Sequence, residues 1–181
     1  VTDVPNQLIA RIAADSKYWL WINDQLVVFE GGLKRGPSPS GTYYDPVDIA
    51  PYLTKGSNTI AILLWHFGKD GFSHINSGKA ALLFEAIAPG LEIVSDASWQ
   101  CALYEAYQNT EAPFPNYRMP ESNIRFDARQ AITNWNRTSF EGSLPGAVCV
   151  GKAGKAPFGD LVERPIPQWK NSGLLSYVSV R

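Results

Sequence analysis

The sequence has little of several residue types on which whole classes of function depend. Its 181 residues include two cysteines, two histidines and one methionine, and the charges nearly cancel to a formal net charge of −1. Basic residues form no cluster, which argues against nucleic acid as a partner. The histidines have no cysteine or carboxylate at the spacing of a metal site. We therefore expect no metal and no other cofactor.

Long apolar runs and helical periodicity are also missing. The longest apolar run, Thr59 to Trp65, is far too short to cross a membrane and fits a buried strand. No sustained 3.6-residue repeat is visible, so the pattern predicts an almost entirely β protein. The length suits one domain that buries about 70% of the surface exposed by its unfolded chain. No membrane partner is expected.

The two cysteines leave an alternative open. Cys101 and Cys149 lie far apart in the sequence, and neither belongs to a C-x-x-C motif. They form a disulfide in an oxidising compartment, or they are buried free thiols.

Strand-forming residues are abundant, and the clearest pattern is a hairpin near the N-terminus. The segment Tyr18–Asn23 alternates large residues, and a second apolar run, Leu26–Phe29, follows after two more residues, Asp24 and Gln25. Asn and Asp tolerate the positive φ of a tight turn, so the two runs predict a β-hairpin. Trp19 and Trp21 share one face, and we expect them in a core or at an interface with a neighbouring domain.

Other segments have strand, turn or loop signals. A single helical turn is predicted over Asp48–Leu53, and an exposed crossover over Gly31–Gly41. Prolines exclude regular structure from Ala112–Pro120. Further strands are predicted at Leu8–Ala14, Asn58–Trp65, Ala80–Ala88, Leu91–Val94, Ser98–Tyr107, Asn123–Asp127, Ala147–Val150 and Leu174–Val180.

Five segments in a fixed order resemble the non-catalytic β-sandwich domain that precedes the catalytic barrel of bacterial α-L-rhamnosidases. They are Ala13–Asp24, Tyr44–Ala61, Ser95–Trp99, Phe126–Arg129 and Glu163–Trp169. Two departures stand out: Asp24 occupies a position where the family usually has glycine, and Phe140–Pro145 lacks a tryptophan that the family has there.

The resemblance implies an antiparallel, jelly-roll-like β-sandwich of the galactose-binding type. It implies that residues 1–168 form this accessory domain, and that residues 169–181 lead toward a following (α/α) catalytic barrel. The expected function is docking to that barrel and shaping the rim of its active site. The expected partners are this catalytic domain and rhamnose-containing glycans, in a periplasmic or extracellular location. The alternative is a stand-alone carbohydrate-binding module for plant or bacterial polysaccharide.

Catalysis by this chain itself is not expected. Glycoside hydrolysis needs two carboxylates on opposite sides of one sugar bond. Nothing in the sequence indicates that any two of Asp70, Glu121 and Asp127 converge.

The segment from Trp65 to His74 is the candidate for sugar binding. Sugar sites combine an aromatic ring with polar groups that reach hydroxyls, and such groups often lie on loops mounted on a rigid sheet. Trp65, His66, Asp70 and His74 provide this chemistry. In the alternative, Trp65 and Phe67 cap the core and the histidines are solvated.

A second pair of residues has a structural or interface role in our interpretation. Asp127 and Arg129 are two positions apart and share a face if they lie in a strand. We expect them to form an ion pair or to bracket a loop, and thereby to pin the proline-rich segment Ala112–Pro120.

Overall fold

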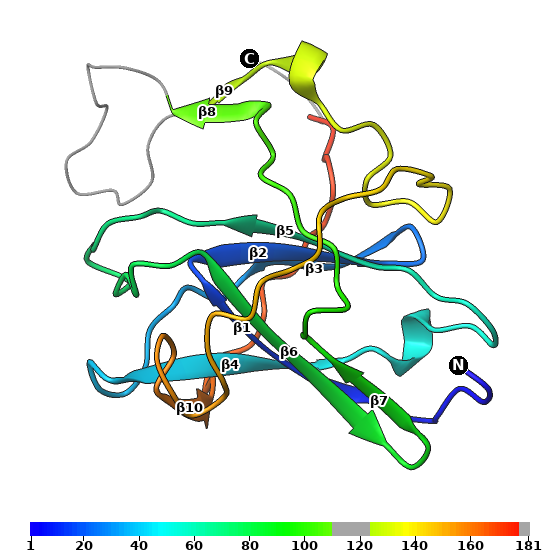
Figure 1. Cartoon of the computed structure of the whole chain (residues 1–181), viewed down its shortest axis with the longest axis horizontal. Coiled ribbons are helices and arrows are strands. Elements are labelled where there is room, and N and C mark those ends of the chain that lie inside the picture. Colours follow the sequence, from blue (N-terminus) through cyan, green and yellow to red (C-terminus); the bar gives the residue numbers. More distant parts are fainter. Residues whose placement is uncertain (110–123, 178–181) are drawn as a thin grey trace.

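The computed structural model describes residues 1–109 and 124–177, and in this part of the chain all regular structure is β apart from two short 3₁₀ turns (Figure 1). This confirms the predicted fold class. The turns are η1 (Ala50–Tyr52) and η2 (Ala128–Gln130). The strands are β1 (Ile9–Asp15), β2 (Lys17–Ile22), β3 (Gln25–Gly31), β4 (Gly41–Asp48), β5 (Ile60–Trp65), β6 (Ala81–Ala88), β7 (Leu91–Val94), β8 (Tyr107–Asn109), β9 (Ile124–Phe126) and β10 (Asp160–Glu163).

The strands form a sandwich of two sheets. One sheet has the order β10-β4-β1-β6-β7 and the other has the order β3-β2-β5. Within these sheets every pairing is antiparallel except that of β10 with β4, which is parallel. The β8–β9 hairpin lies beyond the three-stranded sheet, on the side away from the five-stranded one (Figure 1).

The N-terminal hairpin forms as predicted. Asn23 and Asp24 adopt φ values of 46° and 70°, the left-handed conformation that lets β2 turn directly into β3. The inward face of β2 is fully buried in the core and consists of Tyr18, Leu20 and Ile22. The half-buried side chains of Ile60, Ile62 and Leu64 in β5 pack against the same core.

The sequence pattern did not predict two of the strands, β4 and β10. Gly41–Asp48 is strand β4, although part of it was assigned to a loop and its last residue to a helical turn. Polar residues and Pro46 hide the pattern, yet β4 pairs with β1 on one side and with β10 on the other. Strand β10 follows a long irregular stretch and is mostly exposed, so it has no strong apolar signal.

Three strand predictions are wrong for the described residues. Ser98–Tyr107 contains only the bridge residue Gln100, paired with Gly146, and the first residue of β8. Ala147–Val150 contains no strand or bridge residue. Residues 174–177 form no strand, and the rest of that predicted strand lies outside the described residues, as does the proline-rich segment at 112–120.

Neither alternative for the cysteines is correct, because both thiols are free and exposed. They lie in irregular segments outside the sandwich, where no strand packing covers them. Among the described residues, no helix is long and apolar enough to span a membrane.

Candidate functional site

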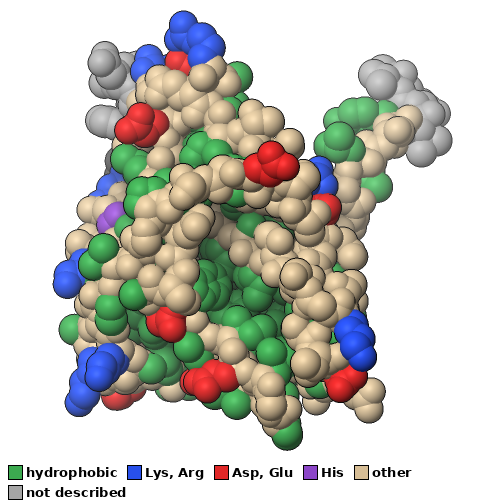
Figure 2. Space-filling view, turned by 45° about the vertical axis from the view of Figure 1, so that its right-hand side comes forward, with side chains coloured by type: hydrophobic (Ala, Val, Ile, Leu, Met, Phe, Trp, Pro, Cys, Tyr) green, Lys and Arg blue, Asp and Glu red, His purple; other side chains and the backbone are tan. Residues whose placement is uncertain are grey.

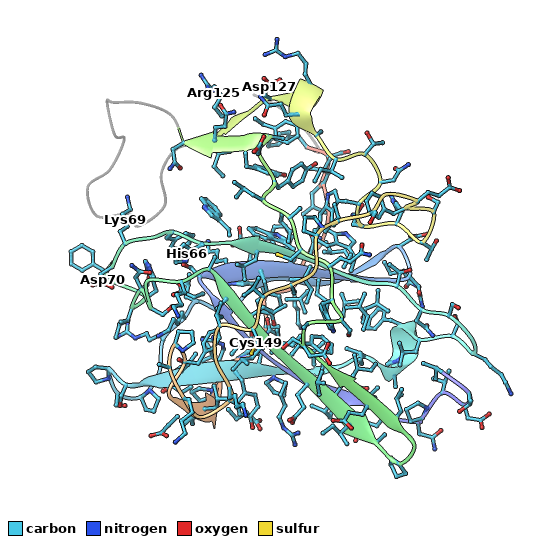
Figure 3. The ribbon with its side chains drawn as sticks, viewed as in Figure 1. His66, Lys69, Asp70, Arg125, Asp127 and Cys149 are labelled. Atoms are coloured by element: carbon cyan, nitrogen blue, oxygen red, sulfur yellow. The ribbon has the colours of Figure 1, made fainter. Side chains whose placement is uncertain are left out.

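The loop between β5 and β6 contains the residues predicted to bind sugar. It lies at one end of the sandwich, where His66, Lys69 and Asp70 are grouped in Figure 3. Arg125 and Asp127 lie elsewhere in the same view, near the β8–β9 hairpin. We call residues 66–79 the braced loop, because side chains from inside and outside it hold its backbone.

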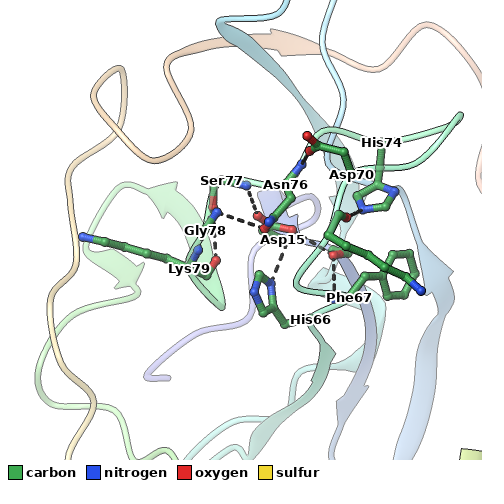
Figure 4. A network of polar contacts seen from close by, with 11 residues as sticks. Asp15, His66, Phe67, Asp70, His74, Asn76, Ser77, Gly78 and Lys79 are labelled. Carbon is green, nitrogen blue, oxygen red and sulfur yellow. Dashed lines mark hydrogen bonds and ion pairs between the residues drawn. The ribbon is translucent and has the colours of Figure 1, made fainter. Parts of the chain in front are cut away.

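Asp15, the last residue of β1, ties the braced loop to the sandwich (Figure 4). Its carboxylate is fully buried and accepts hydrogen bonds from Ser16 Oγ at 2.8 Å and from the Ser77 amide at 2.7 Å. Ser16 Oγ in turn accepts a hydrogen bond from the Phe67 amide at 3.0 Å. The imidazole Nδ1 of His66 lies 3.6 Å from Asp15 Oδ1. Both ends of the loop are therefore fastened at the end of β1.

His74 and Asp70 hold the loop from within. The His74 side chain is buried, its Nε2 lies 2.6 Å from the Lys69 carbonyl oxygen, and its ring packs edge-on against Phe67 at 4.9 Å. Asp70 is exposed and accepts a hydrogen bond from the Asn76 amide at 2.7 Å. Of the four residues predicted to bind sugar, His74 thus lies inside the loop, whereas Asp70 lies at its surface.

Trp65 lies on the outer face of the three-stranded sheet. Its ring stacks on Trp19 with centroids 6.5 Å apart and meets Phe67 edge-on at 5.1 Å. The Lys17 ammonium lies 5.9 Å from the ring centroids of both Trp65 and Phe67, within the range of a cation–π contact. Trp65 and Trp19 therefore form an aromatic layer on the face of the sheet that points away from the core.

The loop exposes a residue that sequence analysis missed. The Phe72 side chain is 77% exposed, and the backbone next to it is held because Arg35 Nη1 donates a 3.0 Å hydrogen bond to the Phe72 carbonyl. The signal was present in the sequence, since Phe72 is an aromatic residue in an otherwise polar segment with Gly68 and Gly71.

Trp21, Asp127 and Arg129 belong to a second region. Trp21 meets Trp135 edge-on at 5.2 Å, so an irregular segment covers this part of the sheet. Arg129 Nη2 donates to Asp127 Oδ2 at 2.7 Å, so the two residues form an ion pair. They do so across the turn η2, which Asp127 caps, and not on one face of a strand as the spacing suggested. The Arg129 side chain and amide hold the pKa of Asp127 below its ordinary value. The prediction that this pair pins the proline-rich segment is not tested, because residues 112–120 lie outside the described residues.

Two of the three carboxylates considered for catalysis lie far from each other in this structure. Asp70 and Asp127 lie at different ends of the molecule (Figure 3), and Glu121 is outside the described residues. Within residues 1–109 and 124–177, no group of three or more His, Cys, Asp or Glu side chains is placed to hold a metal ion.

An apolar cleft opens between the two sheets, where the edge strands β5 and β7 lie on either side of the core. It has a volume of about 490 Å³ and is visible in Figure 2 as a hollow lined by hydrophobic side chains. Its apolar lining consists of Val1, Leu53, Ile60, Leu91 and Ile93. It contains no acid or base side chain and lies apart from the braced loop.

The fold of this chain is similar to part of two solved rhamnosidase structures. The GH78 family rhamnosidase of Bacillus sp. GL1 matches 92% of this chain with a TM-score of 0.81 and 30% sequence identity. The chain is similar to a domain of this rhamnosidase. It spans only 17% of that enzyme's chain. No protein-family model and no curated protein matches the sequence.

A second rhamnosidase shares the fold. The α-L-rhamnosidase from Dictyoglumus thermophilum matches 92% of this chain and 18% of its own, with a TM-score of 0.65 and 20% identity. At this identity the match shows the fold alone. The fold of this chain thus occurs as a small part of two much longer rhamnosidases.

Proposed function

We propose that this chain is a non-catalytic accessory domain of an α-L-rhamnosidase-like glycoside hydrolase, acting in the periplasm or outside the cell. The observation that carries the proposal is the match to a domain-sized part of the Bacillus enzyme at 30% identity. The separation of Asp70 from Asp127 supports a non-catalytic role, because hydrolysis needs two carboxylates at one bond.

The anchoring of Arg164 supports a role in connecting domains. Its guanidinium pairs with the buried carboxylate of Asp45, donates to the Leu33 carbonyl at 3.1 Å and lies over the Tyr43 ring at 5.7 Å. Asp45 also accepts a hydrogen bond from the Tyr18 hydroxyl at 2.9 Å. The backbone that follows β10 therefore leaves the sandwich from a fixed point.

The residues after Arg164 support docking to a neighbouring catalytic domain of the same polypeptide. Of these residues, 165–177 are described and form no helix or strand. Apolar side chains exposed to this extent are typical of surfaces that another surface covers. The side chains concerned are Ile166 (65% exposed), Trp169 (75%), Leu174 (104%), Leu175 (80%) and Tyr177 (89%).

A stand-alone carbohydrate-binding module is the second candidate. The observation in its favour is the exposed ring of Phe72, two positions from the exposed carboxylate of Asp70. An aromatic face with a nearby hydrogen-bonding group is the minimum that a sugar ring requires. Calorimetric titration of the chain with L-rhamnose and rhamnosides tests this candidate directly.

The complete open reading frame that contains this chain tests the first proposal. We expect it to encode a glycosidase catalytic domain, and the full polypeptide to release nitrophenol from p-nitrophenyl α-L-rhamnoside. Residues 1–181 alone are expected to release none. An open reading frame without such a domain, or a full polypeptide inactive on α-L-rhamnosides, would contradict the proposal.

A further inference from the structure

We propose that the braced loop is a preformed docking element. In this proposal the Phe72 side chain inserts into an apolar pocket, rimmed by carboxylates, on the neighbouring catalytic domain. The inference rests on the proposed function, because that function supplies the domain that carries the pocket. It adds the contact surface and the anchoring side chain.

The first argument is that the loop is held in one conformation before it meets a partner. Asp15 and Ser16 fix its two ends through the Ser77 and Phe67 amides. Inside the loop, hydrogen bonds join Asp70 to the Asn76 amide and the Gly71 amide to the His74 carbonyl at 3.3 Å. A flexible loop loses conformational entropy when it binds, whereas a preorganised loop has already lost it on folding. These contacts therefore favour binding through the loop.

The second argument is the exposed side chain of Phe72, at what we call the tip of the braced loop. Single exposed apolar residues are common on protein surfaces and need no explanation by themselves. Phe72 differs because its backbone is fixed by Arg35 and its loop is fixed by the buried Asp15. Aromatic side chains that fill a pocket on the partner are typical centres of binding energy at interfaces.

The third argument is the charge around the tip. Arg35 contacts the Phe72 carbonyl, and Lys69 is exposed next to Asp70, the one carboxylate at the surface of the braced loop. The tip is therefore net positive, and a complementary surface carries an excess of carboxylates. The active-site region of a glycosidase has this chemistry, because it contains at least one pair of carboxyl groups.

The test compares variants of the full polypeptide by hydrogen exchange of the amides in residues 71–75. We expect Phe72→Ala to speed their exchange about tenfold, the effect of losing one dominant interface side chain. Leu103→Ala is the matched control, since Leu103 is 83% exposed but lies outside the loop. It should leave the exchange unchanged. Lys69→Glu should also speed the exchange of these amides, as Phe72→Ala does. Its effect should be smaller at high salt, because salt screens the charges.

Two further measurements separate the possible failures. In residues 1–181 alone, Phe72→Ala should leave both the melting temperature and the exchange of the loop unchanged, because nothing docks there. If an active full polypeptide shows the same exchange with and without Phe72, the docking inference fails and the proposed function stands. If the open reading frame has no catalytic domain, both fail. Protection of the loop by L-rhamnose in the isolated chain would overturn docking in favour of sugar binding.

Discussion

The first 94 residues and the described residues after them are built in different ways. Strands β1 to β7 all lie in the first part, and each has a partner strand along most of its length. The later part contributes three strands of three or four residues. Of the buried hydrophobic residues, only Ala106 and Phe158 come from this later part.

Apart from the pairing of β10 with β4, individual side chains attach the later part to the first. Arg164 reaches the buried Asp45, Trp135 packs on Trp21, and the Thr138 amide and hydroxyl both donate to the Asp24 carboxylate. The comparison shows that strand pairing and a shared core make the sandwich, whereas a few specific contacts position what surrounds it. Each prediction below removes a contact within one part or between the two parts.

The largest effect is expected from Arg164→Met, which removes the guanidinium and leaves the buried carboxylate of Asp45 without its cation. Breaking a buried ion pair from one side costs about 3–5 kcal/mol of unfolding free energy. Urea denaturation followed by tryptophan fluorescence measures the loss. Arg11→Met, which removes an exposed pair with Glu85, is the control and should change stability little. Equal effects of the two changes would mean that Asp45 does not depend on Arg164.

Leu20→Ala tests the core of the first part. Leu20 is fully buried on the inward face of β2, and truncation of such a side chain costs about 2–5 kcal/mol. Ile62→Ala, on the neighbouring strand β5, should cost less, because Ile62 is half-buried. The same urea denaturation measures both. A larger loss at Ile62 than at Leu20 would place the centre of the core closer to β5.

The two parts also differ in how much of their structure the sequence predicts. Alternation of large residues identified β2, a continuous apolar run identified β5, and Asn23-Asp24 identified the turn, because these elements are determined by residues close together in the sequence. Strand β10 pairs with β4 across more than a hundred residues and carries few apolar residues, so no local pattern reveals it.

The candidate site, too, depends on contacts between residues far apart in the sequence, which local patterns do not predict. Composition pointed to the loop after β5, and in the structure a network of polar contacts holds this loop (Figure 4). The roles of its residues depend on distant partners that no spacing predicts. Asp15 and Arg35 approach the loop from other parts of the chain, and through them Phe72 is presented at the surface. The sequence shows that this loop has aromatic and carboxylate side chains, but it does not show which of them point inward.

A smaller effect is expected from Trp135→Ala, which uncovers Trp21 on the outer face of the three-stranded sheet. An edge-to-face aromatic pair contributes about 0.5–1.5 kcal/mol beyond the area that it buries. The loss should therefore be smaller than that of Leu20→Ala. Near-ultraviolet circular dichroism, which reports on tryptophan packing, should change while the far-ultraviolet spectrum stays the same. An altered far-ultraviolet spectrum would mean that Trp135 supports the sandwich itself.

The smallest effect is expected from Asp127→Asn in the later part. Arg129 bonds lower the pKa of Asp127 in the folded protein, so the carboxylate stabilises the fold above its ordinary pKa of 3.8. This contribution is lost as the pH falls through the lowered folded-state value. In thermal unfolding, the separation between the melting temperatures of the parent chain and the variant should therefore be small at neutral pH and absent in strong acid. Because the pair is exposed, the separation should also shrink in high salt. A separation that persists in acid would assign the effect of Asp127 to its hydrogen bond with the Arg129 amide, which an asparagine oxygen retains only in part.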